Sequence, residues 1–158
     1  MPTKHFCQPV KPKLRRMKLQ RPQQMAIPWE ALSRENQKLR LLVEKSPFAV
    51  SIIDQDGRYT YINPKFTELF GYTLQDVPNG RAWFEKAFPD PAYRKEVVSA
   101  WCQDLSKYST GEIRPRTYPV TCKDGSQKLI LFRSVVSETG DHFVTYEDIT
   151  ERRMNEMS

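Results

Sequence analysis

The sequence predicts an α+β fold, in which strands form an antiparallel β-sheet and the helices lie on one face of it. Two short segments of alternating apolar residues, joined by a turn, come first along the chain. Three such segments come last, and the residues between the two groups have the spacing and capping residues of helices. Strands and helices that are segregated in this way are typical of a five-stranded antiparallel sheet with one covered face.

The first element is a helix at residues 29–45. Its sequence, WEALSRENQKLRLLVEK, is rich in good helix formers, and Ser46 and Pro47 end it. Five of its residues, spaced three and four apart, share one seam: Trp29, Leu32, Asn36, Leu39 and Val43. This spacing is typical of a dimeric coiled coil and predicts a homodimer. Because two heptads are few for such a prediction, packing of the helix on its own domain, over the open face of the sheet, is an equal alternative.

A β-hairpin and a short helix follow. The hairpin strands are AVSIID and RYTYIN, and the Asp56-Gly57 pair between them supplies the positive φ angle that a tight turn requires. Asn63 then caps a helix whose first position is Pro64. Gly71 ends that helix in a left-handed conformation.

The second half of the chain contains a longer helix and three strands. Short helical turns over Thr73–Phe88 lead to the helix PAYRKEVVSAWCQDLSKYS, which starts at the capping pair Asp90-Pro91. The strands are EIRPRTYPVTC, QKLILFRSVV and HFVTYEDI. Pro115 and Pro119 place the first of these at a sheet edge, because each proline removes a hydrogen-bond donor of the ladder.

The net charge of +6 resides in residues 1–28, which carry seven Lys or Arg residues and no Asp or Glu. We predict a disordered leader, because this segment has few large apolar side chains to offset its ordering entropy. Nucleic acid is not the favoured partner, since the aromatic residues of a nucleic-acid site are missing, although a transcription regulator using this leader is an alternative. The chain has no apolar signal region and no run long enough to span a membrane, so we expect a cytoplasmic protein.

Three segments, in the right order, resemble the PAS domains of the sensory-box type: DQDGRYTYINPKFTELFGY, VTCKDGSQKLILF and EDITERR. The resemblance covers Ser46–Arg153 and implies a PAS domain at residues 46–153, with the start of a truncated output helix at residues 154–158. It implies a sheet order of 2-1-5-4-3 and a cavity between the sheet and the helices. Members of this family sense ligands, redox state, light or gases.

In function, the resemblance implies a sensor and interaction module of signal transduction, such as those of two-component systems. Family members pass their signal through dimer contacts to histidine kinases, diguanylate cyclases or transcription regulators. We therefore expect an effector in trans, or else that the chain is the detached input domain of a kinase or cyclase. We expect no enzyme, since the sequence has no catalytic triad, GxGxxG segment or P-loop.

The resemblance disfavours the cofactors that family members use. Haem-binding relatives carry a histidine on the long helix, but residues 91–109 contain none, and c-type haem requires a CxxCH motif that is absent. Flavin photoreceptors form an adduct with a cysteine, whereas the matching PNGRAWF segment has Gly80 before Arg81. The cysteines lack the spacing of a metal site. An unidentified small organic ligand remains the expectation.

Alternation along the strands identifies candidate residues of the cavity wall. Successive residues of a strand face opposite sides of the sheet, so if Arg133 faces water, Ile130, Phe132 and Ser134 face inward. By the same rule Val144 and Tyr146 of the last strand face inward. With aromatic residues from the helices, the candidates are Phe66, Phe70, Trp83, Trp101, Ile130, Phe132, Ser134, Val144 and Tyr146. These residues fit a filled core as well as a ligand site, except that the buried hydroxyl of Ser134 needs a partner.

The triplet Asp148, Ile149 and Thr150 is the expected signal junction. Oxygens of Asp148 and Thr150 can accept hydrogen bonds from the free N–H groups of the following helix. The junction would then be a clamp that responds to shifts of the sheet, or merely a helix start. Both interpretations fit the sequence.

Overall fold

The computed structural model describes residues 29–156, so the predicted leader at residues 1–28 lies outside the described residues. The helices are α1 (Trp29–Glu44), α2 (Pro64–Phe70), α3 (Gly80–Ala87), α4 (Pro91–Lys107) and α5 (Thr150–Glu156). The strands are β1 (Ala49–Ile53), β2 (Tyr59–Ile62), β3 (Arg114–Thr121), β4 (Gln127–Val136) and β5 (His142–Asp148). The domain boundary expected after residue 153 therefore falls inside α5.

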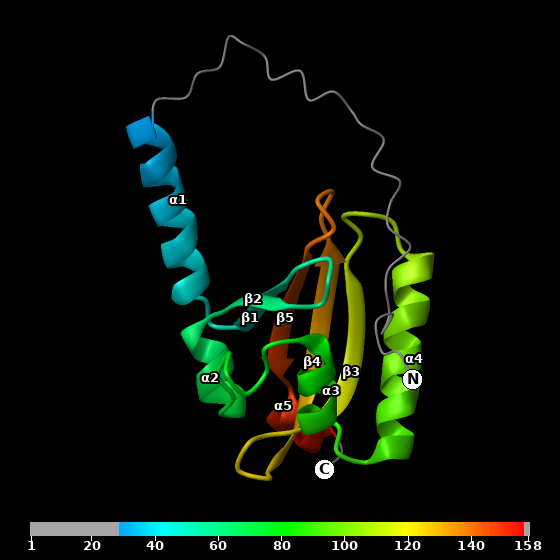
Figure 1. Ribbon diagram of the computed structural model, residues 1–158. Helices are drawn as coiled ribbons and strands as arrows, with labels where there is room; N and C mark the ends of the chain where they lie inside the picture. Colours follow the sequence, from blue (N-terminus) through cyan, green and yellow to red (C-terminus); the bar gives the residue numbers. More distant parts are fainter. Residues whose placement is uncertain (1–28, 157–158) are drawn as a thin grey trace.

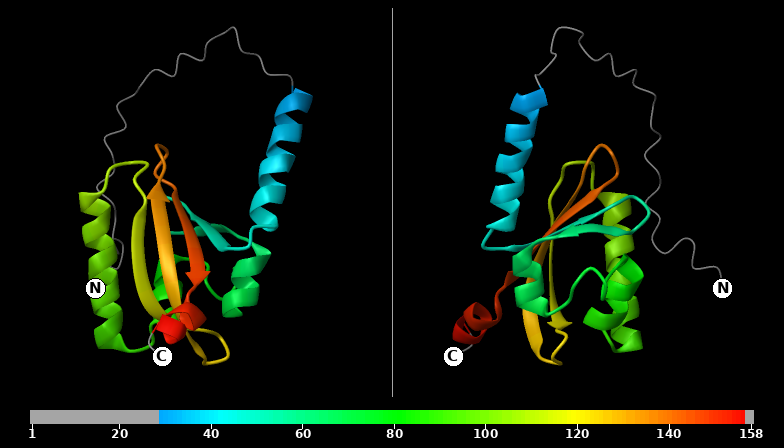
Figure 2. Two further views of the ribbon diagram at one scale, coloured as in Figure 1. Left: turned by 180° about the vertical axis from the view of Figure 1, so that it is seen from behind. Right: turned by 60° about the vertical axis from the view of Figure 1, so that its left-hand side comes forward.

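The strands form one five-stranded antiparallel sheet in the order β2-β1-β5-β4-β3. This confirms the α+β fold and the order that the resemblance implied. Strand β3 lies at an edge, in agreement with the two prolines, Pro115 and Pro119, that it carries. Helices α2, α3 and α4 lie on one side of the sheet, with α4 alongside β3 (Figures 1 and 2). None of the helices described is long and apolar enough to cross a membrane.

The β1–β2 hairpin turns at Gly57, whose φ angle of 85° lies in the left-handed region. A side chain raises the energy of this conformation, so glycine is favoured at the position. The Asp54 carboxylate stabilises the same turn by accepting from the backbone N–H groups of Asp56 and Arg58, both at 2.9 Å. The turn that the Asp-Gly pair predicted is therefore present.

Asn63 joins the end of α1 to β1 and α2. Its buried Oδ1 accepts from the backbone N–H groups of Val50 (2.8 Å) and Phe66 (3.1 Å). Its Nδ2 donates to the carbonyl oxygens of Val43 and Phe48, each at 2.9 Å. The cap predicted for α2 is one of four hydrogen bonds that this amide makes, and all of them stay inside the protein.

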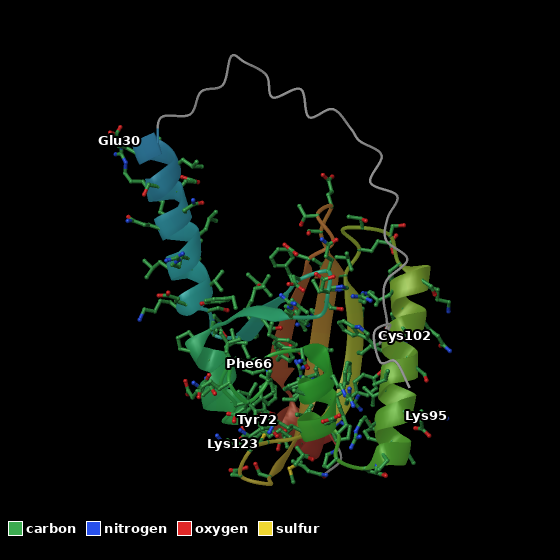
Figure 3. All side chains as sticks on the ribbon, in the orientation of Figure 1. Glu30, Phe66, Tyr72, Lys95, Cys102 and Lys123 are labelled. Carbon is green, nitrogen blue, oxygen red and sulfur yellow. The ribbon has the colours of Figure 1, made fainter. Side chains whose placement is uncertain are left out.

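The core lies between the sheet and helices α2 to α4 and is rich in aromatic side chains. Phe66 projects from α2 into this layer, whereas Lys95 lies on the outer side of α4 (Figure 3). The Tyr72 hydroxyl donates to the Thr121 carbonyl oxygen at 2.8 Å, which ties the segment after α2 to the end of β3. Buried aromatic rings that meet edge to face, as here, pack favourably.

Helix α1 extends away from the sheet instead of covering its open face (Figures 1 and 2). The alternative in which it packs on its own domain is therefore wrong. Of the predicted seam, Leu32 and Leu39 are 42% and 55% exposed, Asn36 is exposed and Val43 is half-buried at the base, while the Trp29 side chain is outside the described part. Leu41 and Leu42 are also exposed, so the apolar surface of α1 is broader than that seam.

Candidate functional site

A cavity of about 150 Å³ lies between the sheet and helices α3 and α4. The inward faces of β3, β4 and β5 form one wall, and Trp83 of α3 and Trp101 of α4 lie on the other. The β1–β2 turn, residues 55–57, also borders the cavity. The wall thus combines strands from the centre and the edge of the sheet with two helices that follow each other along the chain.

Six of the nine predicted cavity residues line this space: Trp83, Trp101, Phe132, Ser134, Val144 and Tyr146. The other three, Phe66, Phe70 and Ile130, are buried but do not line it. Alternation along β4 and β5 does put Ile130 on the inward face, but Ile130 does not line the cavity even though its partner Tyr118 on β3 does. Inward orientation therefore identifies the core face and not the extent of the cavity.

Phe66 and Phe70 are separated from the cavity by two larger rings. The ring of Tyr146 lies 5.1 Å from that of Phe66 and 5.4 Å from that of Phe70, measured between centroids. Trp83 lies 5.6 and 5.2 Å from the same two rings. Since Tyr146 and Trp83 contact both phenyl rings and also line the cavity, the prediction that Phe66 and Phe70 close it is wrong.

The cavity wall also contains polar residues that the sequence analysis missed, namely Asp104, Arg114, Arg116 and His142. Signals for them exist in the sequence. His142 alternates with the predicted inward residues of β5, and Arg114 and Arg116 alternate with buried Val120 in β3. Asp104 continues the helical spacing of four and three from Val97 to Trp101, so it is an acidic residue on an inward stripe.

The register of the sheet brings Arg114 and His142 together. Arg114 lies opposite Ser134, and Ser134 lies opposite Val144. His142 is two residues from Val144 on the same face of β5, which makes it a diagonal neighbour of Ser134. Above them, Trp101 has its ring centroid 4.8 Å from Arg114 Cζ and 5.9 Å from the His142 ring.

The charged groups of the cavity wall fall into a paired set and an unpaired set. Arg116 donates to both carboxylate oxygens of Asp104, from Nε at 2.8 Å and Nη2 at 2.6 Å, and this hydrogen bonding raises the pKa of Arg116. The side chain of Arg114 is buried with no hydrogen-bond partner for any of its three nitrogens. Burial lowers the pKa of Arg114. Burial first, and the Arg114 charge second, lower the pKa of His142 to about 4, so His142 is neutral at pH 7.

Strand β5 leads from the cavity to the predicted junction. Asp148 Oδ1 accepts from the backbone N–H of Thr150 at 3.0 Å and from its hydroxyl. Thr150 Oγ1 in turn accepts from the backbone N–H of Leu129 in β4 at 2.9 Å, instead of from an N–H group of α5 as expected. The difference arises because β5 ends at Asp148, which leaves the Leu129 N–H free for the hydroxyl. Buried Ile149 donates from its N–H to the Leu129 carbonyl oxygen at 2.9 Å.

Comparison with known proteins identifies the fold family. A family model described as the PAS fold matches residues 37–145, more than half of the chain. The chain belongs to the PAS family. It is a signalling domain of that family, whose members are generally sensor modules and not catalysts. No curated protein sequence matches it significantly.

Solved PAS structures share this fold at low sequence identity. The PAS domain of an HTR-like protein from Haloarcula marismortui has 24% identity and a TM-score of 0.60, over 76% of this chain and 96% of that one. A domain of a sensory box sensor histidine kinase/response regulator from Geobacter sulfurreducens has 18% identity and a TM-score of 0.58, over 74% and 96%. The Cronobacter turicensis RpfR quorum-sensing receptor PAS domain, in complex with C12:0, has 20% identity and a TM-score of 0.53, over 68% and 99%.

Proposed function

We propose that this PAS domain senses a small organic molecule, which binds in the cavity and acts on an effector through the β5–α5 junction. The observation that carries the proposal is the course of β5. Val144 and Tyr146 line the cavity, and Asp148 closes the junction only two residues beyond Tyr146. A ligand that shifts β5 against β4 would also shift the hydrogen bond from Leu129 to Thr150.

The cavity favours a compact ligand over the large cofactors of the family. A cavity of about 150 Å³ in another protein holds one benzene ring. The cavity here has the same volume of about 150 Å³, which supports a ligand of about one ring over the three fused rings of a flavin or the haem macrocycle. No group of three or more His, Cys, Asp or Glu side chains within residues 29–156 could hold a metal ion. The complex of the RpfR PAS domain with C12:0 supports the idea that this fold can hold organic ligands.

The output would pass through a homodimer to a histidine kinase, a diguanylate cyclase or another effector. The exposed leucines of α1 support a dimer, because association would remove apolar surface from water. The matching domain of a sensor histidine kinase supports the choice of effector class. Dimer and effector belong to the proposal together with the ligand.

Native mass spectrometry of the protein as isolated tests the proposal. We expect a dimer that releases a small organic molecule on collisional activation. Hydrogen exchange then tests the relay: the Leu129 and Thr150 amides should exchange at different rates in the protein as isolated and in protein refolded without small molecules. A monomer without any retained mass, or identical exchange at both amides, would contradict the proposal.

A further inference from the structure

Arg114 is a buried charged residue to which no described side chain, within residues 29–156, is hydrogen-bonded, although the charge of Asp104 acts on it. Only 2% of its surface is exposed, and Nε, Nη1 and Nη2 all lack a hydrogen-bond partner. A guanidinium group has five N–H donors and stays protonated at neutral pH. Leaving such a group unpaired and away from water is costly, and buried charges in proteins are normally paired.

The carboxylate on the cavity wall whose charge acts on Arg114 is already engaged in hydrogen bonds to another residue. Asp104 uses both of its carboxylate oxygens for Arg116, at 2.6 and 2.8 Å, in the two-point geometry that Arg and carboxylates prefer. Trp101 faces the Arg114 guanidinium at 4.8 Å, and this contact stabilises the charge but satisfies none of the N–H groups. The donors of Arg114 are therefore open to a group that comes from outside the chain.

A second buried donor lies beside Arg114. Nδ1 of His142 is also buried without a hydrogen-bond partner, and His142 is only 5% exposed. A neutral imidazole can carry its hydrogen on either ring nitrogen and so can donate to an anion. Ser134, directly opposite Arg114, adds a buried hydroxyl to the same wall. Three potential donors from β3, β4 and β5 thus meet at one end of the cavity.

The cavity wall also contains a group of large aromatic side chains. Trp83, Phe88 and Phe132 line the same cavity, and all three are buried. A ligand that fits has an anionic head for Arg114 and a compact hydrocarbon body for these rings. We propose that the cavity binds a small organic monocarboxylate, held by Arg114 through its carboxylate, with His142 and Ser134 as further donors. This inference rests on the proposed function and names its ligand class.

Titration calorimetry and thermal unfolding of the full chain test the inference with matched pairs of probes. The acids are benzoate, phenylacetate and hexanoate, and the neutral controls are benzamide, phenylacetamide and hexanamide. We expect at least one acid to bind and to raise the unfolding temperature, about tenfold or more tightly than its own amide, because hydrogen bonds to charged groups are the stronger ones. Inorganic phosphate serves as the anion without a hydrocarbon body and should bind more weakly than that acid.

Variants link the effect to Arg114. Arg114→Met should remove the preference for acid over amide, while Arg114→Lys should retain part of it, since lysine keeps the charge but loses the planar two-point geometry. Arg133→Met is the matched control. Arg133 is on the same sheet, but its guanidinium pairs with Glu147 at 3.1 Å, and neither residue lines the cavity. This variant should therefore bind as the unchanged protein does.

The histidine signal gives a readout that does not depend on affinity. The chain has two histidines, so comparison with His142→Gln assigns the imidazole resonances of His142 in NMR spectra. Arg114, Asp141 and Asp54 are the charged groups that act on His142. A carboxylate between Arg114 and His142 would offset the Arg114 charge and raise the pKa of His142 when the preferred acid is added.

The outcomes separate this inference from the proposed function. Equal binding of acid and amide, or an unchanged acid preference in Arg114→Met, would overturn the carboxylate site while leaving a cavity that binds organic molecules. Failure of every acid to bind at millimolar concentration would also overturn the inference. In that case a retained neutral molecule in the mass spectrum would still support the proposed function, and an empty mass spectrum would remove both.

Discussion

Asn63 and Arg114 are both buried polar side chains that border the same core, and their surroundings differ completely. The Asn63 amide makes four hydrogen bonds, to groups at the end of α1, just before β1, in β1 and in α2. The Arg114 guanidinium makes none. A fully paired buried group stabilises one structure, whereas an unpaired one costs stability unless a ligand completes it. The first region therefore serves the fold, and the second is where binding is expected.

The largest effect is expected at Asn63. Asn63→Ala removes the four hydrogen bonds of the amide, so we expect a loss of about 4 kcal/mol in the free energy of unfolding, at roughly 1 kcal/mol for each bond. Denaturant-induced unfolding at pH 7 measures it.

Asn79→Ala is the matched control for that variant. Asn79 is exposed, and it caps α3 with one hydrogen bond of 2.8 Å to the Ala82 N–H. Its loss should cost about 1 kcal/mol, as for an ordinary cap. Equal losses for the two variants would mean that the buried network adds nothing.

The next largest effect is a pH dependence of the free energy of unfolding that arises from His142. Its pKa is about 4 in the folded protein, against an ordinary value of 6.5. The unfolded chain therefore binds a proton more readily, and the stabilising contribution present above pH 6.5 is lost as the pH falls toward 4. The loss amounts to at most about 3 kcal/mol.

His142→Gln isolates this contribution from the titration of the carboxylates. Unfolding free energies of both proteins, measured between pH 7 and pH 4.5, should converge as the pH falls, because only the unchanged protein loses the histidine contribution. Two curves that stay parallel would show that His142 does not titrate abnormally.

At Arg114, in contrast, we expect the substitution to increase the free energy of unfolding. Arg114→Met removes an unpaired buried charge and keeps a flexible apolar side chain beside Trp101, so we expect the ligand-free protein to gain about 2 kcal/mol. Arg133→Met, on an exposed pair, should change stability by less than about 0.5 kcal/mol. A large loss of stability in Arg114→Met would remove the contrast with Asn63.

The smallest effect is expected at the junction, where the polar groups are paired but exposed. Asp148→Ala removes the acceptor of the Thr150 N–H and hydroxyl and should cost about 1 kcal/mol. Asp90→Ala, at the start of α4, is a similar cap with no link to β4 and serves as control. If only the Asp148 variant changes hydrogen exchange at the Leu129 amide, the junction couples β5 to β4. Equal effects of both variants would mean that the junction is only the start of α5.

Most of the fold could be predicted because it depends on local patterns. The Asp56-Gly57 turn, the Asn63 cap and the edge prolines of β3 act within a few residues of themselves. The cavity depends on contacts between distant segments, and so its extent was missed: Phe66 and Phe70 are shielded by Tyr146, whose position along the chain gives no hint of this. The role of Arg114 could not be predicted, because pairing of Asp104 with Arg116 instead of Arg114 is decided by three-dimensional geometry. Alternation alone would have identified His142.

The edges of the sheet also bear on how the protein behaves in a crowded solution. An exposed edge strand invites the addition of a strand from another molecule, which is a route to aggregation. Here one edge, β3, contains Pro115 and Pro119, and the other, β2, spans only the four residues Tyr59–Ile62. Both features discourage strand addition. We therefore expect contacts with other proteins to involve the helices and the open face of the sheet more than its two edge strands.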